Sequence, residues 1–151
     1  MSPTLCTTTH GNCADASAVA IIVTGGSGGP PPYTNNYTSV ELLHGDGSPW
    51  CSLPDLPEGR WHHTQTGLEA CGGDHTYPTS YTSCVKFTDG TWTPSHNLLQ
   101  YRYNHVSWAS PVGTVLMGGP GYDDLPRETT ELLDEATEES VMYFPLKYYT
   151  T

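Results

Sequence analysis

Apolar residues along this chain gather in short runs separated by turn-forming residues, and one kind of run occurs three times. The runs cover residues 18–23, 68–71 and 114–117, and each leads into a pair of glycines. The first glycines of successive pairs are 47 and 46 residues apart, which indicates a structural repeat of three units. The pairs are Gly25 and Gly26, Gly72 and Gly73, and Gly118 and Gly119.

Further short segments in each unit read as strands. Segments 38–43, 82–87 and 129–133 follow the glycine pairs. Asp89 and Gly90 lie between two extended segments, and this dipeptide predicts a tight hairpin turn. About four short strands in about 47 residues is the content of one β-propeller blade.

The composition also favours an all-β chain. A length of 151 residues suits one domain with a sizeable core. Only 14% of the residues are charged, whereas Gly, Pro, Thr and aromatic residues are plentiful. Such a mixture suits short strands and turns better than helices, which draw on Ala, Leu, Glu and Lys.

Charge and hydropathy exclude two kinds of partner. The net charge is -11 and only five residues are Lys or Arg, so we expect no nucleic-acid partner. No apolar run reaches the ~20 residues that a membrane-spanning helix needs, and we expect no membrane span. No signal peptide is visible at the start of the sequence.

Aromatic and basic residues follow the same repeat. An aromatic residue comes after each glycine pair, at Trp50, Trp92 and Tyr143, and segments 60–63 and 102–105 share the spacing Arg-x-x-His. Together with the glycine pairs, these features resemble the kelch repeat, a four-stranded blade whose apolar second strand ends in Gly-Gly. Tyr143 departs from the pattern, because tryptophan is expected there, and an acidic insertion precedes it.

The resemblance covers residues 18–147 and implies a division of the chain. The sequences of segments 53–56, 70–73 and 82–85 are similar to those found in secreted kelch-like proteins of invertebrate animals. The paired glycines would allow close backbone approach, and the aromatic residues would fill the wedge between blades. The implied parts are an N-terminal lead or edge strand at 1–17, blades at 18–57 and 58–99, and a third blade with the lead into a further one at 100–151.

Three blades are too few for a closed ring, since propellers close with about four to eight. The ring is therefore incomplete unless the protein is oligomeric or part of a longer chain. Two copies completing six blades, or a head-to-tail array, would also cover the open faces. We expect the partners to be other copies or further blades, and possible additional partners are other extracellular proteins or glycans.

The cysteines and one sequon bear on the compartment. In an antiparallel hairpin that pairs Cys71 with Cys84, the turn falls near residues 77–78, which is sterically sensible for a disulfide. The alternative is two free buried thiols. Asn36 begins an Asn-x-Thr acceptor for N-glycosylation in a loop-forming stretch, and with five cysteines this favours an extracellular, secreted protein. The pairing of Cys6, Cys13 and Cys51 stays open.

No catalytic, cofactor or metal site is predicted. His62 and His63 are adjacent, so on a strand they point to opposite faces and do not chelate one ion easily. His63 and His105 recur at one repeat position, which favours hydrogen bonding between strands. Eight acidic residues between positions 123 and 139 do not match an EF-hand and read as a solvated loop.

These observations favour a non-catalytic extracellular kelch-propeller module for protein interaction or structural self-assembly. One alternative is a copper-dependent oxidase of the kelch-propeller type, which copper content and a tyrosine-cysteine absorption would identify. The other is a glycan-binding lectin, which a glycan array would identify. No motif of the oxidase or of a serine hydrolase is recognisable in the sequence.

Overall fold

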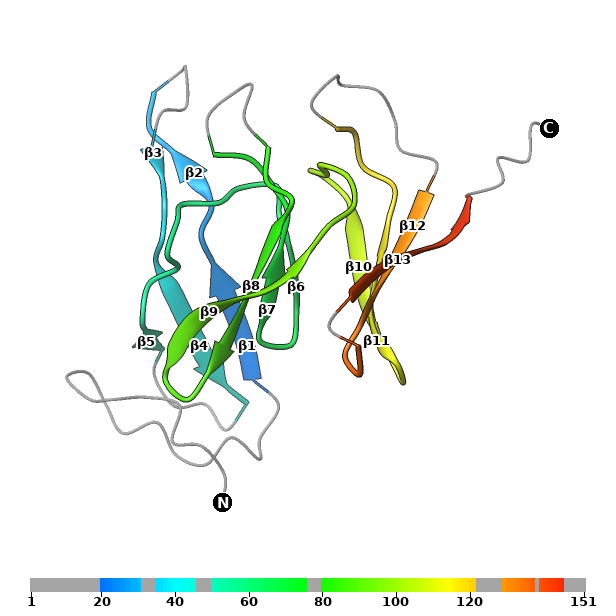
Figure 1. Ribbon diagram of the computed structural model, residues 1–151. Coiled ribbons are helices and arrows are strands. Elements are labelled where there is room, and N and C mark those ends of the chain that lie inside the picture. Colours follow the sequence, from blue (N-terminus) through cyan, green and yellow to red (C-terminus); the bar gives the residue numbers. More distant parts are fainter. Residues whose placement is uncertain are drawn as a thin grey trace.

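The computed structural model describes residues 20–30, 35–45, 50–75, 80–121, 129–137 and 139–145 (Figure 1). All regular secondary structure in these residues is β, in four antiparallel sheets of which none is closed. The predicted all-β class is therefore confirmed. The predicted lead at 1–17, with Cys6 and Cys13, lies outside the described residues.

The first sheet has the strand order β1 (Ala20–Thr24), β4 (Val40–His44) and β5 (Cys51–Leu53). A separate two-stranded ribbon is formed by β2 (Ser27–Gly28) and β3 (Asn35–Asn36). Among the described residues the main sheet of this unit thus has three strands, whereas the sequence predicted about four. The β-branched and leucine side chains of β1 and β4 suit strands that are covered on one face.

The second sheet is a four-stranded meander in the order β6-β7-β8-β9. Its strands are β6 (Thr64–Thr66), β7 (Glu69–Cys71), β8 (Ser83–Thr88) and β9 (Thr91–Asn97). Asp89 and Gly90 join β8 to β9 with φ angles of 52° and 85°. Positive φ at both central residues is typical of a type I′ hairpin turn, as the dipeptide predicted.

The third sheet repeats this meander one unit further along the chain, in the order β10-β11-β12-β13. Its strands are β10 (Val106–Ser110), β11 (Gly113–Met117), β12 (Thr129–Asp134) and β13 (Glu139–Pro145). A register shift between Thr130 and Glu131 interrupts its outer pair of strands. The second and third units therefore have the four strands that the sequence predicted.

Backbone hydrogen bonds put the three units in one register. The first glycine of each pair donates its N–H to a carbonyl on the following strand, and β1, β7 and β11 are therefore equivalent second strands. The bonds are Gly25 to Ser39, Gly72 to Ser83 and Gly118 to Thr129, at 2.9, 3.2 and 3.3 Å.

The paired glycines adopt a conformation that other residues rarely reach, because all six have positive φ angles. Gly73 shows why the position also needs a small residue. A Cβ atom there would lie 2.5 Å from the carbonyl oxygen of Trp61 and 2.8 Å from His63. The glycine pairs thus allow the segments that precede β6 and β10 to lie directly against the strand ends that carry the glycines.

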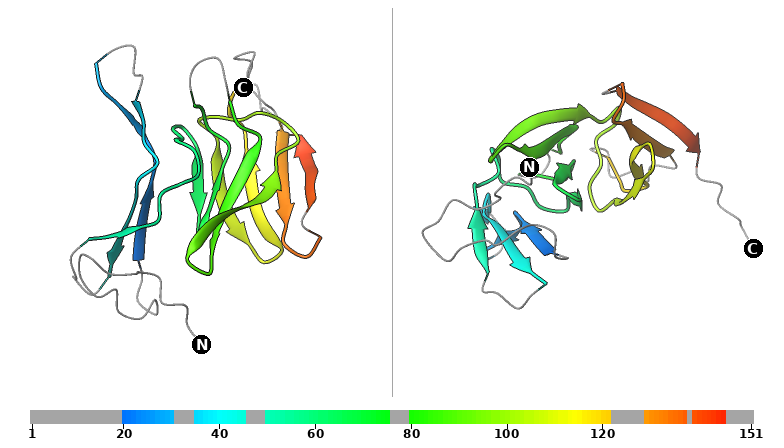
Figure 2. Two further views of the ribbon diagram at one scale, coloured as in Figure 1. Left: turned by 60° about the vertical axis from the view of Figure 1, so that its left-hand side comes forward. Right: turned by 90° about the horizontal axis from the view of Figure 1, so that it is seen from below.

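The three larger sheets stand side by side along a curve, with the second sheet in the middle (Figure 2). One core joins the first and second sheets, and a smaller one joins the second and third. The first contains Val40, Leu42, Cys51, Leu53, Leu56, Ala70, Val85, Phe87 and Trp92. The second contains Cys71, Cys84, Leu98, Leu116 and Leu133. Each sheet therefore buries its apolar side chains against a neighbouring repeat.

Candidate functional site: the junctions between sheets and the two end faces

Two equivalent arginines hold the junctions between successive units. The carbonyl of Arg60 accepts the N–H of Gly26 at 2.7 Å, and the carbonyl of Arg102 accepts the N–H of Gly73 at 2.8 Å. Each guanidinium then donates to its own unit, to the carbonyls of Gly72 and Gly118 respectively, at 3.0 and 2.7 Å. Each arginine therefore connects the glycine turn of the preceding unit to the glycine turn of its own unit.

The two arginines differ in their ionic surroundings. Arg102 and Glu131 are both fully buried, and Arg102 Nε donates to Glu131 Oε1 at 2.8 Å. The other carboxylate oxygen accepts the N–H of Leu99 at 2.7 Å. A buried charge needs such pairing, because burial without a partner costs several kcal/mol. Glu131 thereby ties the third sheet to the segment that arrives from the second.

Arg60 has an aromatic partner in place of a buried carboxylate. Its guanidinium carbon lies 4.3 Å from the centre of the Tyr81 ring, a cation–π contact. Its ion pair with Glu58 is looser, at 3.8 Å, and Glu58 is exposed. Burial lowers the pKa of Arg60, against the opposing effect of Glu58. Burial and the nearby Glu58 carboxylate raise the pKa of Tyr81 to about 12.

Two equivalent histidines make the hydrogen bonds between sheets that their repeat position predicted. His63 Nε2 lies 2.7 Å from the hydroxyl of Thr24, which itself donates to Gln65 Oε1 at 3.0 Å. His105 Nε2 lies 2.8 Å from the hydroxyl of Thr64. Each histidine of one unit thus contacts a threonine of the preceding unit.

These histidines are held in the neutral form. Burial is the largest cause, and the neighbouring guanidinium of Arg60 or Arg102 adds to it, so the pKa of each histidine falls to about 4. The Nδ1 atoms of both rings are buried and have no hydrogen-bond partner in the described part of the chain. A protonated ring would therefore place a second charge beside a buried arginine.

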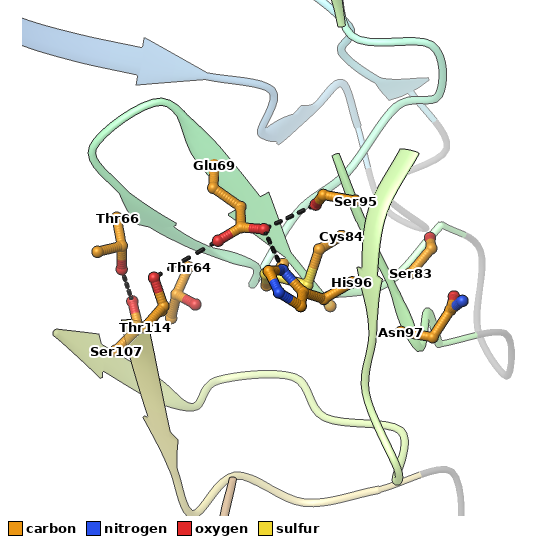
Figure 3. Close-up of a disulfide and its surroundings, with 12 residues drawn as sticks. Thr64, Thr66, Glu69, Ser83, Cys84, Ser95, His96, Asn97, Ser107 and Thr114 are labelled. Atoms are coloured by element: carbon orange, nitrogen blue, oxygen red, sulfur yellow. Dashed lines mark hydrogen bonds and ion pairs between the residues drawn. A yellow bond between two sulfur atoms is a disulfide. The ribbon is translucent and has the colours of Figure 1, made fainter. Parts of the chain in front are cut away.

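A polar network lies at the junction of the second and third sheets, next to the disulfide (Figure 3). Glu69 is buried, and its Oε1 accepts from Ser95 at 2.7 Å and from His96 Nδ1 at 2.9 Å. Its Oε2 lies 3.4 Å from the hydroxyl of Thr114 on the third sheet. Glu69 therefore joins two strands of its own sheet to the next sheet.

Chemically, this network differs from a hydrolase triad. In a triad the histidine bridges the nucleophile and the acid. Here the carboxylate of Glu69 bridges Ser95 and His96, and both donate to the same oxygen atom. The serine hydroxyl therefore donates directly to a carboxylate, and the arrangement lacks the histidine base that lies between serine and acid in a triad.

The disulfide joins the strand ends beside this network. The sulfur atoms of Cys71 and Cys84 are 2.09 Å apart, and the two residues lie directly opposite each other in β7 and β8. This is the hairpin pairing that their positions predicted. Glu69, Cys71 and Cys84 also bring their donor atoms within 4.8 Å of one another. Because the sulfurs are bonded to each other, the group offers a metal ion only one carboxylate.

Two cavities of about 290 and 180 Å³ open near this junction. Both are lined by Lys86 of the second sheet and Glu135 of the third, whose charged groups are 3.7 Å apart. Both of these side chains are exposed, so the pair is worth little to stability. The remaining lining is mainly hydroxyl-bearing and small side chains.

Two outward sheet faces are apolar and partly exposed. We define the start face as Ile21, Val23, Leu43 and Trp50, on the side of the first sheet that points away from the second sheet. We define the end face as Trp108, Val115, Leu132 and Val141, one cross-strand row on the outer side of the third sheet. Trp108 and Val141 are exposed, whereas Val115 and Leu132 are buried. Scattered apolar residues are common on protein surfaces, whereas a contiguous row marks an interaction surface.

Of the predicted aromatic positions, Trp92 lies between sheets. It is 7% exposed, contacts Phe87, and donates its Nε1–H to the carbonyl of Pro54 in the first unit at 2.8 Å. Trp50 is 46% exposed. In the third sheet the residue in register with Trp92 is Ser140, because it pairs with Leu133 as Trp92 pairs with Phe87. The predicted equivalence of Tyr143 with Trp92 is therefore corrected. The first glycine lies 14 residues before its hydrogen-bonded partner on the next strand in the first unit and 11 residues before it in the third, so equal spacing from the glycine does not reach equivalent positions.

Asn36, the predicted glycosylation acceptor, lies in β3 rather than in an open loop. Its Nδ2 donates to the carbonyl of His75 in the second unit. Its Oδ1 is buried, and a Cβ on Gly59 would lie 2.8 Å from both the Cβ and the carbonyl oxygen of Asn36. The Asn36 amide thus takes part in a contact between units in this structure, and its glycosylation stays a prediction.

Sequence reasoning missed the buried carboxylates Glu69 and Glu131. The sequence did contain an indication of them, because an acidic residue inside an otherwise apolar strand needs a buried partner. The partners, His96 and Arg102, lie 27 and 29 residues away in the chain. No local spacing could have identified them.

Comparison of the chain with protein-family models and with curated proteins finds no match. No helix suited by length and hydropathy to crossing a membrane occurs among the residues that the structure describes. The repeated junctions and the two apolar faces are the structural features that bear on function.

Proposed function

We propose that this chain is a non-catalytic, extracellular module of the kelch-propeller type that acts by associating with further units like its own. The observation that carries the proposal is the recurrence of one junction. The contacts of Arg60 and His63 with the first unit recur as those of Arg102 and His105 with the second. A repeat that buries its core only against neighbours needs a partner at each open end.

The polar chemistry of the described residues supports a structural role over a catalytic one. Glu69, the two arginines and His105 are buried, His63 is partly buried, and all of them make contacts within and between sheets. The two cavities are lined mainly by polar side chains and a surface ion pair. An active site, in contrast, places a nucleophile, a base and a stabilising group around one reacting atom.

An extracellular setting agrees with the disulfide. Such bonds persist in oxidising compartments and are rare where thiols are kept reduced. Cys71 and Cys84 are both buried at the junction of the second and third sheets, where the bond holds the glycine end of a hairpin. Treating the secreted protein with a glycosidase would test the compartment. A loss of mass in the unaltered chain but not in the Asn36→Gln variant would show that Asn36 carries a glycan.

The mass of the native particle tests the proposal. We expect light scattering across a wide concentration range to give a particle of more than one chain, with no bound copper and no oxidase activity. A particle that stays at the mass of one chain at every concentration would contradict the proposal. Stoichiometric copper or specific binding on a glycan array would favour the oxidase or the lectin instead.

A further inference from the structure

The start face has the side chains of an internal junction face but no neighbour among the described residues. Trp50 extends the register of β4 and β5 to the position that Trp92 has in the second sheet. Trp92 is 7% exposed because it packs on the first sheet, whereas Trp50 is 46% exposed. Val23 is 47% exposed, and its equivalents Ala70 and Leu116 are fully buried. The exposed fractions differ because the first sheet has no described neighbour on this side, and not because the residues differ in type.

The end face lies on the third sheet, and its residues match those of the first-sheet surface on which Trp92 packs. In the first sheet Ile22, Leu42 and Cys51 form a cross-strand row that packs on the second sheet. In the third sheet the same three positions hold Val115, Leu132 and Val141. Both rows are apolar.

The second sheet shows that this likeness is not a general property of the repeat. Its corresponding row is polar, with Glu69, Lys86 and Thr93, and it faces the hydroxyl-bearing side of the third sheet. Apolar receiving rows thus occur only in the first and third described sheets. The third sheet is consequently suited to a neighbour that presents an apolar row with a tryptophan.

We propose that a second copy of this chain supplies that neighbour, so that the start face of each copy packs on the end face of the other. This inference rests on the proposed function, and it names the partner and the two surfaces. The contact continues the interface already present between the first and second sheets. Two chains of three units would make six units, a number within the range at which propellers close. The head-to-tail contact, made twice about a two-fold axis, would leave no open end.

One polar residue on the same side of the first sheet as the start face opposes the contact, and replacing it should strengthen the association. Glu41 pairs with Val23 across β1 and β4 and is exposed. Docking would desolvate its carboxylate, which is costly without a partner. The second unit has Val85 at this position, buried against the first sheet, and the third has Glu131, which is buried with Arg102 as its partner. Residues 1–57 contain no Lys or Arg that could pair with Glu41 in the same way. We expect Glu41→Val to tighten the association at least several-fold.

The decisive experiment places one charge on each face. We expect the unaltered chain to give twice the mass of one chain, and both Trp50→Asp and Val141→Asp to halve that mass. The matched control is Val112→Asp, since Val112 is also exposed but lies in the turn between β10 and β11. Circular dichroism of each variant verifies that the fold is kept.

Mixing the two variants separates this geometry from a general loss of association. Trp50→Asp retains an intact end face and Val141→Asp an intact start face, so an equimolar mixture should form a one-to-one complex through a single contact. Unchanged dimers in either variant, or a mixture that stays monomeric, would overturn the inference. Particles larger than two chains would overturn the closed ring and leave the proposed function standing, whereas a monomeric unaltered chain would contradict both.

Discussion

Acidification tests the two buried histidines at the junctions between sheets. His105 has a folded-state pKa of about 4, against 6.5 for a free histidine, because burial and the charge of Arg102 disfavour its protonated form. The unfolded chain therefore binds a proton at a higher pH than the folded chain does. The stability that the neutral ring contributes is complete above pH 6.5 and is lost progressively as the pH falls from 6.5 to about 4.

The size of this loss follows from the two pKa values. The full difference corresponds to about 3 kcal/mol for one histidine. At pH 5 the unfolded ring is almost fully protonated and the folded ring is about one tenth protonated, which gives about 2 kcal/mol. His63 has the same shift from the same causes, with Arg60 as the neighbouring charge.

The variant His105→Gln isolates this contribution, because the glutamine amide can still donate to Thr64 and does not titrate. Urea unfolding followed by tryptophan fluorescence gives the free energy of unfolding at pH 7.5 and at pH 5. We expect the unaltered chain to lose about 2 kcal/mol more than this variant over that interval. Val112→Gln is the control, since it replaces an exposed side chain that does not titrate, and it should keep the slope of the unaltered chain.

The reasoning would be refuted by parallel slopes. If His105→Gln lost as much stability as the unaltered chain between pH 7.5 and pH 5, the ring would not be a buried neutral base. The carboxylates titrate in both proteins, so their contribution cancels in the difference.

Three further predictions concern residues at the same junctions. Glu131→Gln leaves Arg102 buried without its carboxylate and should lower the free energy of unfolding by roughly 3 kcal/mol, against less than ~0.5 kcal/mol for the exposed Glu135→Gln. Gly73→Ala should cost well over the ~1 kcal/mol expected for Gly67→Ala. Both glycines have positive φ, but a new Cβ meets backbone only at Gly73, so equal losses in urea unfolding would argue against close approach. Replacing both cysteines of the disulfide by alanine should cost about 3 kcal/mol, and an unchanged urea midpoint would show that the bond contributes nothing.

The local features of the fold could be predicted because they depend on short-range chemistry. The glycine pairs require positive φ and close backbone approach, and the Asp89–Gly90 turn requires two left-handed residues. Cys71 and Cys84 flank a hairpin, so alternation along two antiparallel strands brings them together. The repeat spacing adds long-range information, because equivalent residues in successive units contact equivalent partners.

The aromatic residues show where spacing failed. Trp50 and Tyr143 both lie 25 residues after a first glycine, yet only Trp50 occupies the register position of Trp92. The first glycine lies 14 residues before its hydrogen-bonded partner on the next strand in the first unit but 11 residues before it in the third, and the sequence contains no local mark of this difference in connection length. Exposure was also unpredictable, because it depends on whether a neighbouring unit covers the residue.

The sequence alone determined that the chain is all-β, that it consists of repeated units, and where its glycine turns and hairpins lie. These properties follow from backbone conformation and alternating side chains, which act over a few residues. The tertiary structure decided which polar side chains meet at the junctions, such as Glu69 with His96 and Arg102 with Glu131. It also decided which faces stay open, because burial is a property of neighbours that no single strand specifies.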